Sequence, residues 1–223
     1  MTQQEMKRAA VAALESNDLE AIRTLALADR KILSVLVRLA YDKETLVGRR
    51  AIVAIGRVAS VFAANNYDFL RETVRKLLWS LSDESGAIGW SAPEILGEIV
   101  SADPKNFADV VPLIAEVYSI EERVFRPGVL YAFRKIAETH PDMIMPYLDI
   151  IVDGLSEKDP EARIYALELA GMLKERFDFE KLKCVRSGVG ILVNDKNEAW
   201  IYSNDNYIGI EVGNTADKVS RQL

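Results

Sequence analysis

The stretch DPEARIYALELAGML, residues 159 to 173, decides how the rest of the chain is interpreted. Asp159 stands directly before Pro160, which is the arrangement of a cap residue followed by a proline at the first helical position. Small residues follow at Ala166 and Gly171, among large apolar side chains. A helix with small residues at these positions can approach its neighbours closely. The stretch therefore predicts one helix of a closely packed set.

Apolar residues recur at helical spacing through the first 180 residues, where strand-type alternation is absent. Leu70, Val74, Leu77 and Leu81 form one such series. The connections between these segments span only a few residues, which favours antiparallel neighbours. The pattern predicts roughly ten short amphipathic helices.

Four of the helical stretches can be superposed as repeats. Their first shared position is held by Ala51, Ala92, Gly128 and Ala166, at successive spacings of 41, 36 and 38 residues. The second, five residues later, is held by Gly56, Gly97, Phe133 and Gly171. Small residues there let the second helix of one hairpin pack against the next, so that the stack buries a continuous apolar seam. Phe133 predicts an interface with a different spacing.

This register resembles the HEAT-repeat family, whose period is about 40 residues, and DPEARIYALELAGML is the nearest match to its signature. The resemblance implies an all-α fold, a right-handed α-α superhelix of four to five HEAT-like (armadillo-like) helical hairpins over residues 1–183. It does not define the function, because such stacks serve scaffolding, transport, DNA repair and chromophore attachment alike.

The composition changes after Arg176. The segments GVGILV, AWIY and NYIGIEV are rich in β-branched and aromatic residues and are separated by the turn-forming stretches NDKNE and SNDN. We expect a small three-stranded antiparallel β-meander over residues 188–212, within a tail of residues 184–223 that ends in a short helix. The tail would cap the apolar end of the stack. Alternatively, an exposed edge strand would offer a homodimer or peptide contact.

Composition argues against several classes of function. The chain has 28 basic and 34 acidic residues, a net charge of −6, whereas a protein that grips phosphate backbones is usually basic. The N-terminal sequence lacks the apolar core of a secretory signal, and no apolar run approaches the roughly 20 residues that span a bilayer. Cys184 is the single cysteine, which fits a reducing compartment. We expect a soluble cytoplasmic protein that binds neither membranes nor, by default, nucleic acid.

The candidates for chemistry are few. His140 is the single histidine and precedes Pro141 at a helix end, so catalytic triads and histidine-rich zinc sites lack their residues. Cys184 has only Lys183 and Arg186 nearby in sequence to lower its pKa. Phosphate-binding glycine loops and hydrolase elbows are absent. We therefore expect no catalytic residue, no metal site and no cofactor.

The stretch SDESGAIGWSAPEILGEIV, residues 82–100, departs from the repeat pattern. Pro93 occupies the position of Ile52 and Leu167, inside the second helix of the hairpin. A proline there removes a hydrogen bond and crowds a carbonyl, so we expect a kinked helix or one that begins late. Trp90 occupies the position that Arg49 and Arg126 hold in the neighbouring repeats.

These positions predict a binding ridge on the concave face, at the positive ends of the second helices. Its predicted members are Arg49, Arg50, Trp90, Glu94, Arg126 and Arg163. Arginine and tryptophan are enriched at binding hot spots. In the alternative interpretation, the arginines pair with acids of neighbouring turns and hold the stack together. Asp42, Asp83, Glu84 and Asp159 are the candidate acids.

The sequence thus favours a non-enzymatic binding or scaffold module whose concave face holds a protein partner. One alternative is a HEAT-like lyase-type enzyme, or an accessory subunit that acts on a bound cofactor or modified protein. A second is recognition of nucleic-acid lesions, and a third is a purely structural subunit of a larger complex.

Overall fold

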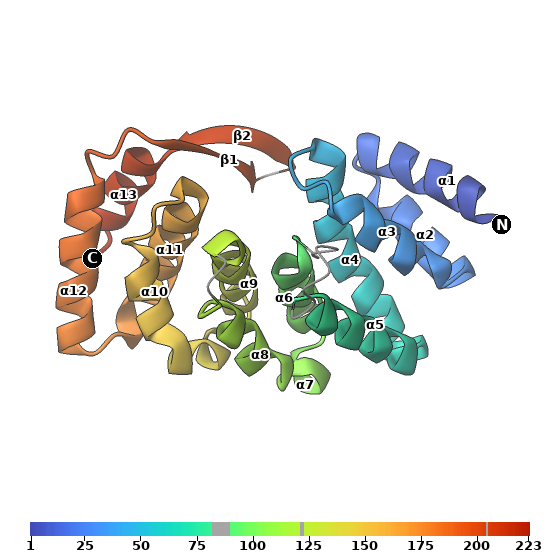
Figure 1. Cartoon of the computed structure of the whole chain (residues 1–223), viewed down its shortest axis with the longest axis horizontal. Coiled ribbons are helices and arrows are strands. Elements are labelled where there is room, and N and C mark those ends of the chain that lie inside the picture. The colour runs from blue at the N-terminus through green and yellow to red at the C-terminus, as the bar shows by residue number, and fades with distance from the viewer. Residues whose placement is uncertain (82–89, 121–122, 204) are drawn as a thin grey trace.

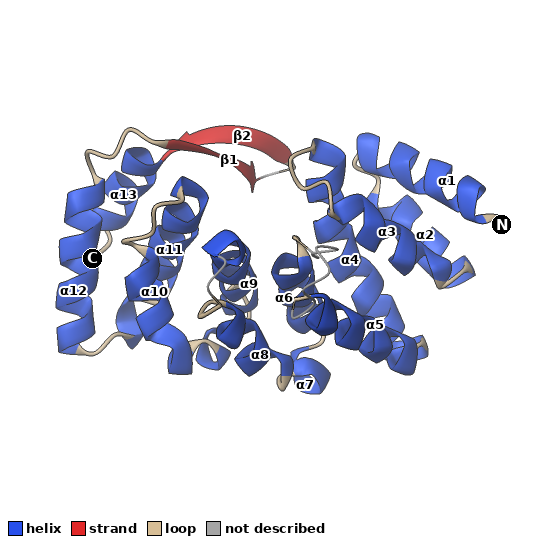
Figure 2. Cartoon of the chain, in the orientation of Figure 1, coloured by secondary structure: helices blue, strands red, loops and turns tan. Residues whose placement is uncertain are grey.

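The chain forms an α-solenoid, an arc of two layers of helices, in a computed structural model that describes residues 1–81, 90–120, 123–203 and 205–223 (Figure 1). Helices make up nearly all of it, and the sheet is a single hairpin near the C-terminus (Figure 2). The helical class and the paired repeats predicted from the sequence are confirmed.

The inner layer consists of the second helix of each pair. Each inner helix packs against the next, in the order α4, α6, α9, α11 and α13. Their bounds are α4 Leu46–Asn65, α6 Ala92–Ala102, α9 Arg126–Ala137, α11 Pro160–Met172 and α13 Val212–Ser220.

The remaining helices form the outer layer and the N-terminal end of the arc. Their bounds are α1 Gln3–Glu15, α2 Leu19–Ala28, α3 Lys31–Ala40, α5 Tyr67–Ser80, α7 Pro104–Phe107, α8 Val110–Val117, α10 Leu148–Gly154 and α12 Phe179–Leu192. Short 3-10 turns are η1 Arg123–Phe125, η2 Pro141–Met143, η3 Met145–Tyr147 and η4 Lys174–Arg176.

The stretch DPEARIYALELAGML forms α11, as predicted. The Asp159 carboxylate accepts hydrogen bonds from the backbone amides of Glu161, at 2.8 Å, and Ala162, at 3.3 Å. Pro160 follows at the first helical position, where it costs no hydrogen bond. Ala166 and Leu167 are fully buried. The cap and the proline set where α11 begins, and the helix packs between α9 and α13.

The small-residue positions lie where inner helices approach each other. A Cβ atom added at Gly97 would lie 2.5 Å from the Cα atom of Ala132, so α6 and α9 are in backbone contact there. The reason inferred for small residues, close packing in the stack, is confirmed at this interface. Phe133, in the corresponding position of α9, is buried and packs against Tyr147, with 5.4 Å between ring centroids.

Helix α6 begins late, which is one of the two outcomes expected from Pro93. It starts at Ala92, so Pro93 lies in its first turn and not in the interior that the repeat register predicted. By contrast, α4 begins five residues before its equivalent position, Ala51. A proline in the first turn removes only an amide that has no intrahelical acceptor, so the helix starts where the proline is tolerated. Gly86 and Gly89 lie outside the described residues.

The prediction of a three-stranded meander was wrong in its first strand. The segment GVGILV is the end of α12, which spans the expected boundary between residues 183 and 184. Val185, Val189 and Leu192 are buried on one face of this helix, so burial at helical spacing overrides the β preference of the branched residues. Helix α12 packs against α10 and α13, and α13 also packs against α11, so this last pair covers the C-terminal end of the stack.

The other two predicted strands form a hairpin that leaves the stack and crosses its open side. Strands β1 (Glu198–Ser203) and β2 (Asn206–Glu211) are antiparallel. Strand β1 packs against α11 through buried Ala199 and Ile201, while β2 contacts both α13 and α4. Figure 1 shows the hairpin arching from the C-terminal helices to α4. It therefore connects the C-terminal end of the arc to α4.

Candidate binding site on the concave face

The residues of the predicted ridge all lie at or near the N-terminal ends of the inner helices. Three of the six are not accessible to a partner, because Arg49, Glu94 and Arg163 are 3%, 1% and 7% exposed. Trp90, directly before α6, is 43% exposed. The structure brings Arg49, Arg50 and Glu94 into one polar region beneath the hairpin and places Arg126 and Arg163 in separate ion pairs.

Arg49 makes an ion pair that spans the concave side. One of its guanidinium nitrogens donates to Glu161 Oε1 at 2.8 Å, so a residue of α4 contacts a residue of α11 past the two helices between them. Burial alone would lower the pKa of Arg49, but the Glu161 carboxylate raises it above its ordinary value. The arc is closed at this level by a charged contact that is out of solvent.

A second buried ion pair lies next to the first. Lys43 Nζ donates to Glu94 Oε1 at 2.9 Å, and both side chains are largely buried. Burial lowers the pKa of Lys43, and the Glu94 carboxylate more than compensates, so the net shift is upward. The Oε2 atom of Glu94 is buried and has no hydrogen-bond partner among the described residues.

The hairpin covers this polar region through contacts with Arg49 and Arg50. Arg50 donates to the carbonyl of Asp205 at 3.2 Å and to the carbonyls of Leu14 and Glu15 at 2.8 and 2.9 Å. The guanidinium of Arg49 lies 5.5 Å from the centroid of the Tyr207 ring, within range of a cation–π contact. Asp205 itself has φ of 63°, a left-handed conformation that aspartate tolerates better than most residues.

The other two arginines of the ridge are also paired. Arg126 bonds to Glu157 and lies over the ring of Tyr118, 4.5 Å from its centroid. Arg163 donates to the carbonyl of Glu157 at 2.6 Å and pairs with Asp195 at 3.0 Å. The arginines thus hold the stack together, as the structural alternative expected. Their partners are acids other than those suggested by the sequence, of which Asp83 and Glu84 lie outside the described residues.

Two of the small-residue positions make room for buried carboxylates of α6. A Cβ atom at Gly56 would lie 2.5 Å from Glu98 Oε2, and one at Gly128 would collide with Glu94. The Tyr131 hydroxyl donates to Glu98 Oε1 at 2.7 Å. Burial raises the pKa of Glu98 to about 7, although Lys135 and Tyr131 act in the opposite direction. Glu98 is therefore partly protonated near neutral pH.

Glu98 borders one of two adjoining hollows along α4. The first, about 280 Å³, is lined by Val53, Gly56, Arg57, Ser60, Glu98, Ser101, Ala102 and Lys135. The second, about 420 Å³, is lined by Leu19, Glu20, Arg23, Leu27, Arg57, Ser60, Val61, Ala64 and Asn65. They share Arg57 and Ser60 and form one surface, here called the α4 groove, which runs from α2 across α4 to α6 and α9.

Arg57 stands at the centre of the α4 groove. Its side chain is exposed, and no carboxylate among the described residues lies within ion-pair distance of it. Lys135, at one end of the groove, pairs with Glu138 at 3.1 Å. Arg57, Glu98 and Lys135 were not predicted from the sequence as site residues. A usable signal was the acid at position 98 in the otherwise apolar run Ile95–Val100, one turn after Glu94.

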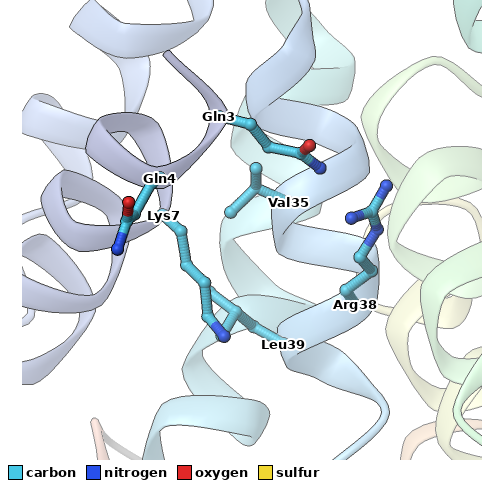
Figure 3. A pocket seen from close by; sticks show the side chains of 6 residues that line it. All are labelled: Gln3, Gln4, Lys7, Val35, Arg38 and Leu39. Atoms are coloured by element: carbon cyan, nitrogen blue, oxygen red, sulfur yellow. The ribbon is translucent and has the colours of Figure 1, made fainter.

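A third hollow of about 410 Å³ lies between α1 and α3 at the N-terminal end of the arc (Figure 3). Its lining consists of Gln3, Gln4, Lys7, Val35, Arg38 and Leu39. With the Gln3 side-chain amide turned so that its oxygen faces Arg38, this oxygen accepts a hydrogen bond from the Arg38 guanidinium at 2.6 Å. This hydrogen bond engages the Arg38 guanidinium within the hollow.

The residues considered for chemistry are dispersed. Cys184 and His140 are both exposed, and the His140 ring nitrogen contacts the Thr139 hydroxyl at 2.8 Å. Within the described ranges, no group of three histidine, cysteine, aspartate or glutamate side chains is arranged to hold a metal ion. In the same part of the chain, none of the helices combines the length and apolar character needed to cross a bilayer.

No model of a known protein family matches the sequence, and no curated protein matches it at a significant level. Among solved structures, the chain is similar to the archaeal HEAT-like repeats protein from Thermococcus onnurineus NA1. The sequence identity is 16% and the TM-score is 0.43, over 100% of this chain and 97% of that chain.

Proposed function

We propose that this protein is a non-enzymatic binding module that holds a segment of a protein partner in the α4 groove. The observation that carries the proposal is Arg57, an exposed guanidinium shared by two adjoining hollows and unpaired among the described residues. The ridge arginines Arg49, Arg126 and Arg163, in contrast, are each in an ion pair. Arginine is among the residues most enriched at binding hot spots.

The shape and composition of the α4 groove favour a protein segment as the ligand. The groove crosses four helices and combines cations with apolar surface, including Leu27, which is 58% exposed. Its lining contains three basic side chains, Arg23, Arg57 and Lys135, against two acidic ones, Glu20 and Glu98. The whole chain, in contrast, has a net charge of −6. A segment with acidic and apolar side chains complements this surface.

In this proposal the predicted ridge has two roles. Its buried arginines and Glu94 set the curvature of the arc and hence the shape of the groove. Trp90 remains a proposed contact, because its indole is the exposed member of the ridge and tryptophan is enriched at hot spots. The lyase-type, nucleic-acid and purely structural alternatives stay predictions.

The test compares partner capture by matched charge-reversal variants. Arg57→Glu changes the centre of the α4 groove, while Arg75→Glu changes an exposed arginine on the outer helix α5. We expect Arg57→Glu to lose the proteins that the wild type retains from native lysate, and Arg75→Glu to retain them. Identical sets of retained proteins for wild type and Arg57→Glu, with both folded by circular dichroism, would contradict the proposal.

A further inference from the structure

The smaller hollow of the α4 groove is a built polar cavity. Its wall is formed by α4, α6 and α9, and its volume of about 280 Å³ is below that of most drug-sized sites. Glu98 lines it while being only 3% exposed. The missing side chain of Gly56 makes room for the Glu98 carboxylate, since a Cβ atom there would lie 2.5 Å from Glu98 Oε2. A cavity of this size suits one side chain of a larger ligand.

Charged and polar groups near Glu98 come from α4 and from the C-terminal half of α9. Helix α4 contributes Arg57, which lines the same cavity, α9 contributes Tyr131, Arg134 and Lys135, and Glu138 follows directly after α9. Of these, Tyr131 donates to Oε1, while Arg134 is engaged by Glu168 at 2.5 Å and by Glu138 at 3.3 Å. The free donors at the cavity are therefore the Arg57 guanidinium and the protons of Lys135 not used by Glu138.

We infer that this cavity receives a carboxylate side chain, aspartate or glutamate, of the bound protein segment, and that Glu98 takes up a proton from solvent as the carboxylate enters. The inference rests on the proposed function, whose ligand it specifies. Arg57 and Lys135 supply the positive charge for the incoming group, and a guanidinium and a carboxylate form strong charge-assisted hydrogen bonds.

Proton uptake follows from the burial of Glu98. A second carboxylate brought into the same cavity disfavours the ionised form of Glu98, because like charges at short range raise each other's pKa. Burial already places the pKa of Glu98 at about 7. The ligand thus shifts Glu98 from partly to fully protonated at neutral pH. The resulting O–H group can donate a hydrogen bond to the ligand carboxylate, as in other coupled carboxyl pairs.

The Ser60 and Ser101 hydroxyls line the same cavity and are committed only to backbone carbonyls. Ser60 Oγ donates to the Gly56 carbonyl at 3.1 Å, and Ser101 Oγ donates to the Lys135 carbonyl at 3.3 Å. Hydroxyls rotate at little cost, so either proton can turn toward an incoming oxygen. Their backbone amides also report on occupancy of the cavity.

The experiment uses N-acetylglutamate amide as the probe and its glutamine analogue as the neutral control. We expect the acid to shift the amide NMR signals of Gly56, Ser60 and Ser101 saturably, and the glutamine analogue to leave them unchanged. Arg57→Gln should weaken binding about tenfold or more, the loss expected for one charge-assisted hydrogen bond.

Proton linkage is measured by calorimetry at pH 7 in buffers of different ionisation enthalpy. Wild type should take up a fraction of a proton per probe bound, whereas Glu98→Gln should bind within about threefold of wild type without proton uptake. Equal shifts with the glutamine analogue, or proton uptake that persists in Glu98→Gln, would overturn the inference. Probe binding without Arg57-dependent partner capture would instead leave this site standing and remove the proposed function.

Discussion

The replacement of Gly97 by alanine tests the packing of the inner layer most sharply. The new Cβ atom would lie 2.5 Å from Ala132 Cα and 2.6 Å from Ala132 Cβ, so the backbone of α6 or α9 has to move. Overpacking of this kind costs about 1–3 kcal/mol, and contact with backbone places Gly97→Ala in the upper part of that range. In a helix interior, alanine is more stable than glycine by about 1 kcal/mol, which offsets part of this cost. We expect a net destabilisation of about 2 kcal/mol.

Two matched glycine variants separate crowding from helix propensity. Gly171 holds the same repeat position in α11, but the nearest atom to its added Cβ would be Oε1 of the flexible Gln222 side chain, at 3.0 Å. Val219 would follow at an ordinary contact distance of 3.5 Å. Gly190, on the exposed face of α12, has no atom within 4 Å of an added Cβ. Gly171→Ala should be near neutral, and Gly190→Ala should stabilise the fold by about 0.5–1 kcal/mol.

Thermal or urea unfolding provides the assay. For a chain of this size, about 2 kcal/mol lowers Tm by roughly 4–8 °C. If Gly97→Ala unfolds at the same temperature as wild type while Gly190→Ala is stabilised, then α6 and α9 are not in backbone contact. In that event the repeat register that placed glycine there has no physical basis.

Two further predictions concern buried charges. Arg49→Met should destabilise the folded state by about 3 kcal/mol or more, because it leaves the Glu161 carboxylate buried without its partner. The double variant with Glu161→Met should recover much of this loss. Additive losses of the two single variants in urea unfolding would refute this prediction. Burial raises the pKa of Glu98 to about 7, so between about pH 4.5 and 7 the folded state binds a proton that the unfolded state does not. The stabilising effect of this proton is complete below about pH 4.5 and is lost as the pH rises through 7. Glu98→Gln should therefore stabilise the protein at pH 8, by at most about 3 kcal/mol, and not at pH 4; a pH-independent effect would contradict the account.

The sequence was sufficient for the architecture because its signals are local. The cap and proline at Asp159 and Pro160 locate the start of α11, and the small residues at Ala166 and Gly97 mark packed faces. The segment GVGILV was misassigned because branched residues favour strands only weakly. Burial of Val185, Val189 and Leu192 at helical spacing determined the structure there.

The site depended on contacts that no local pattern reveals. Arg49 and Glu161 are 112 positions apart, and they meet only because the arc curves until α4 and α11 face each other. The hairpin contact of Arg50 with Asp205 spans 155 positions for the same reason. The spacing of Arg49, Trp90 and Arg126 predicted their placement at helix starts correctly. It could not show that the arginines would be paired and Arg57 unpaired.

Site-specific photo-crosslinking from the α4 groove tests the central claim most directly. A photoreactive residue in place of Val61, within the groove, is compared with one in place of Leu113, on the outer helix α8. The account predicts a discrete protein adduct from position 61, with the crosslinked peptide rich in aspartate or glutamate, and its loss when Arg57→Glu is added. An adduct that forms from position 113 and not from position 61, or one unaffected by Arg57→Glu, would contradict it.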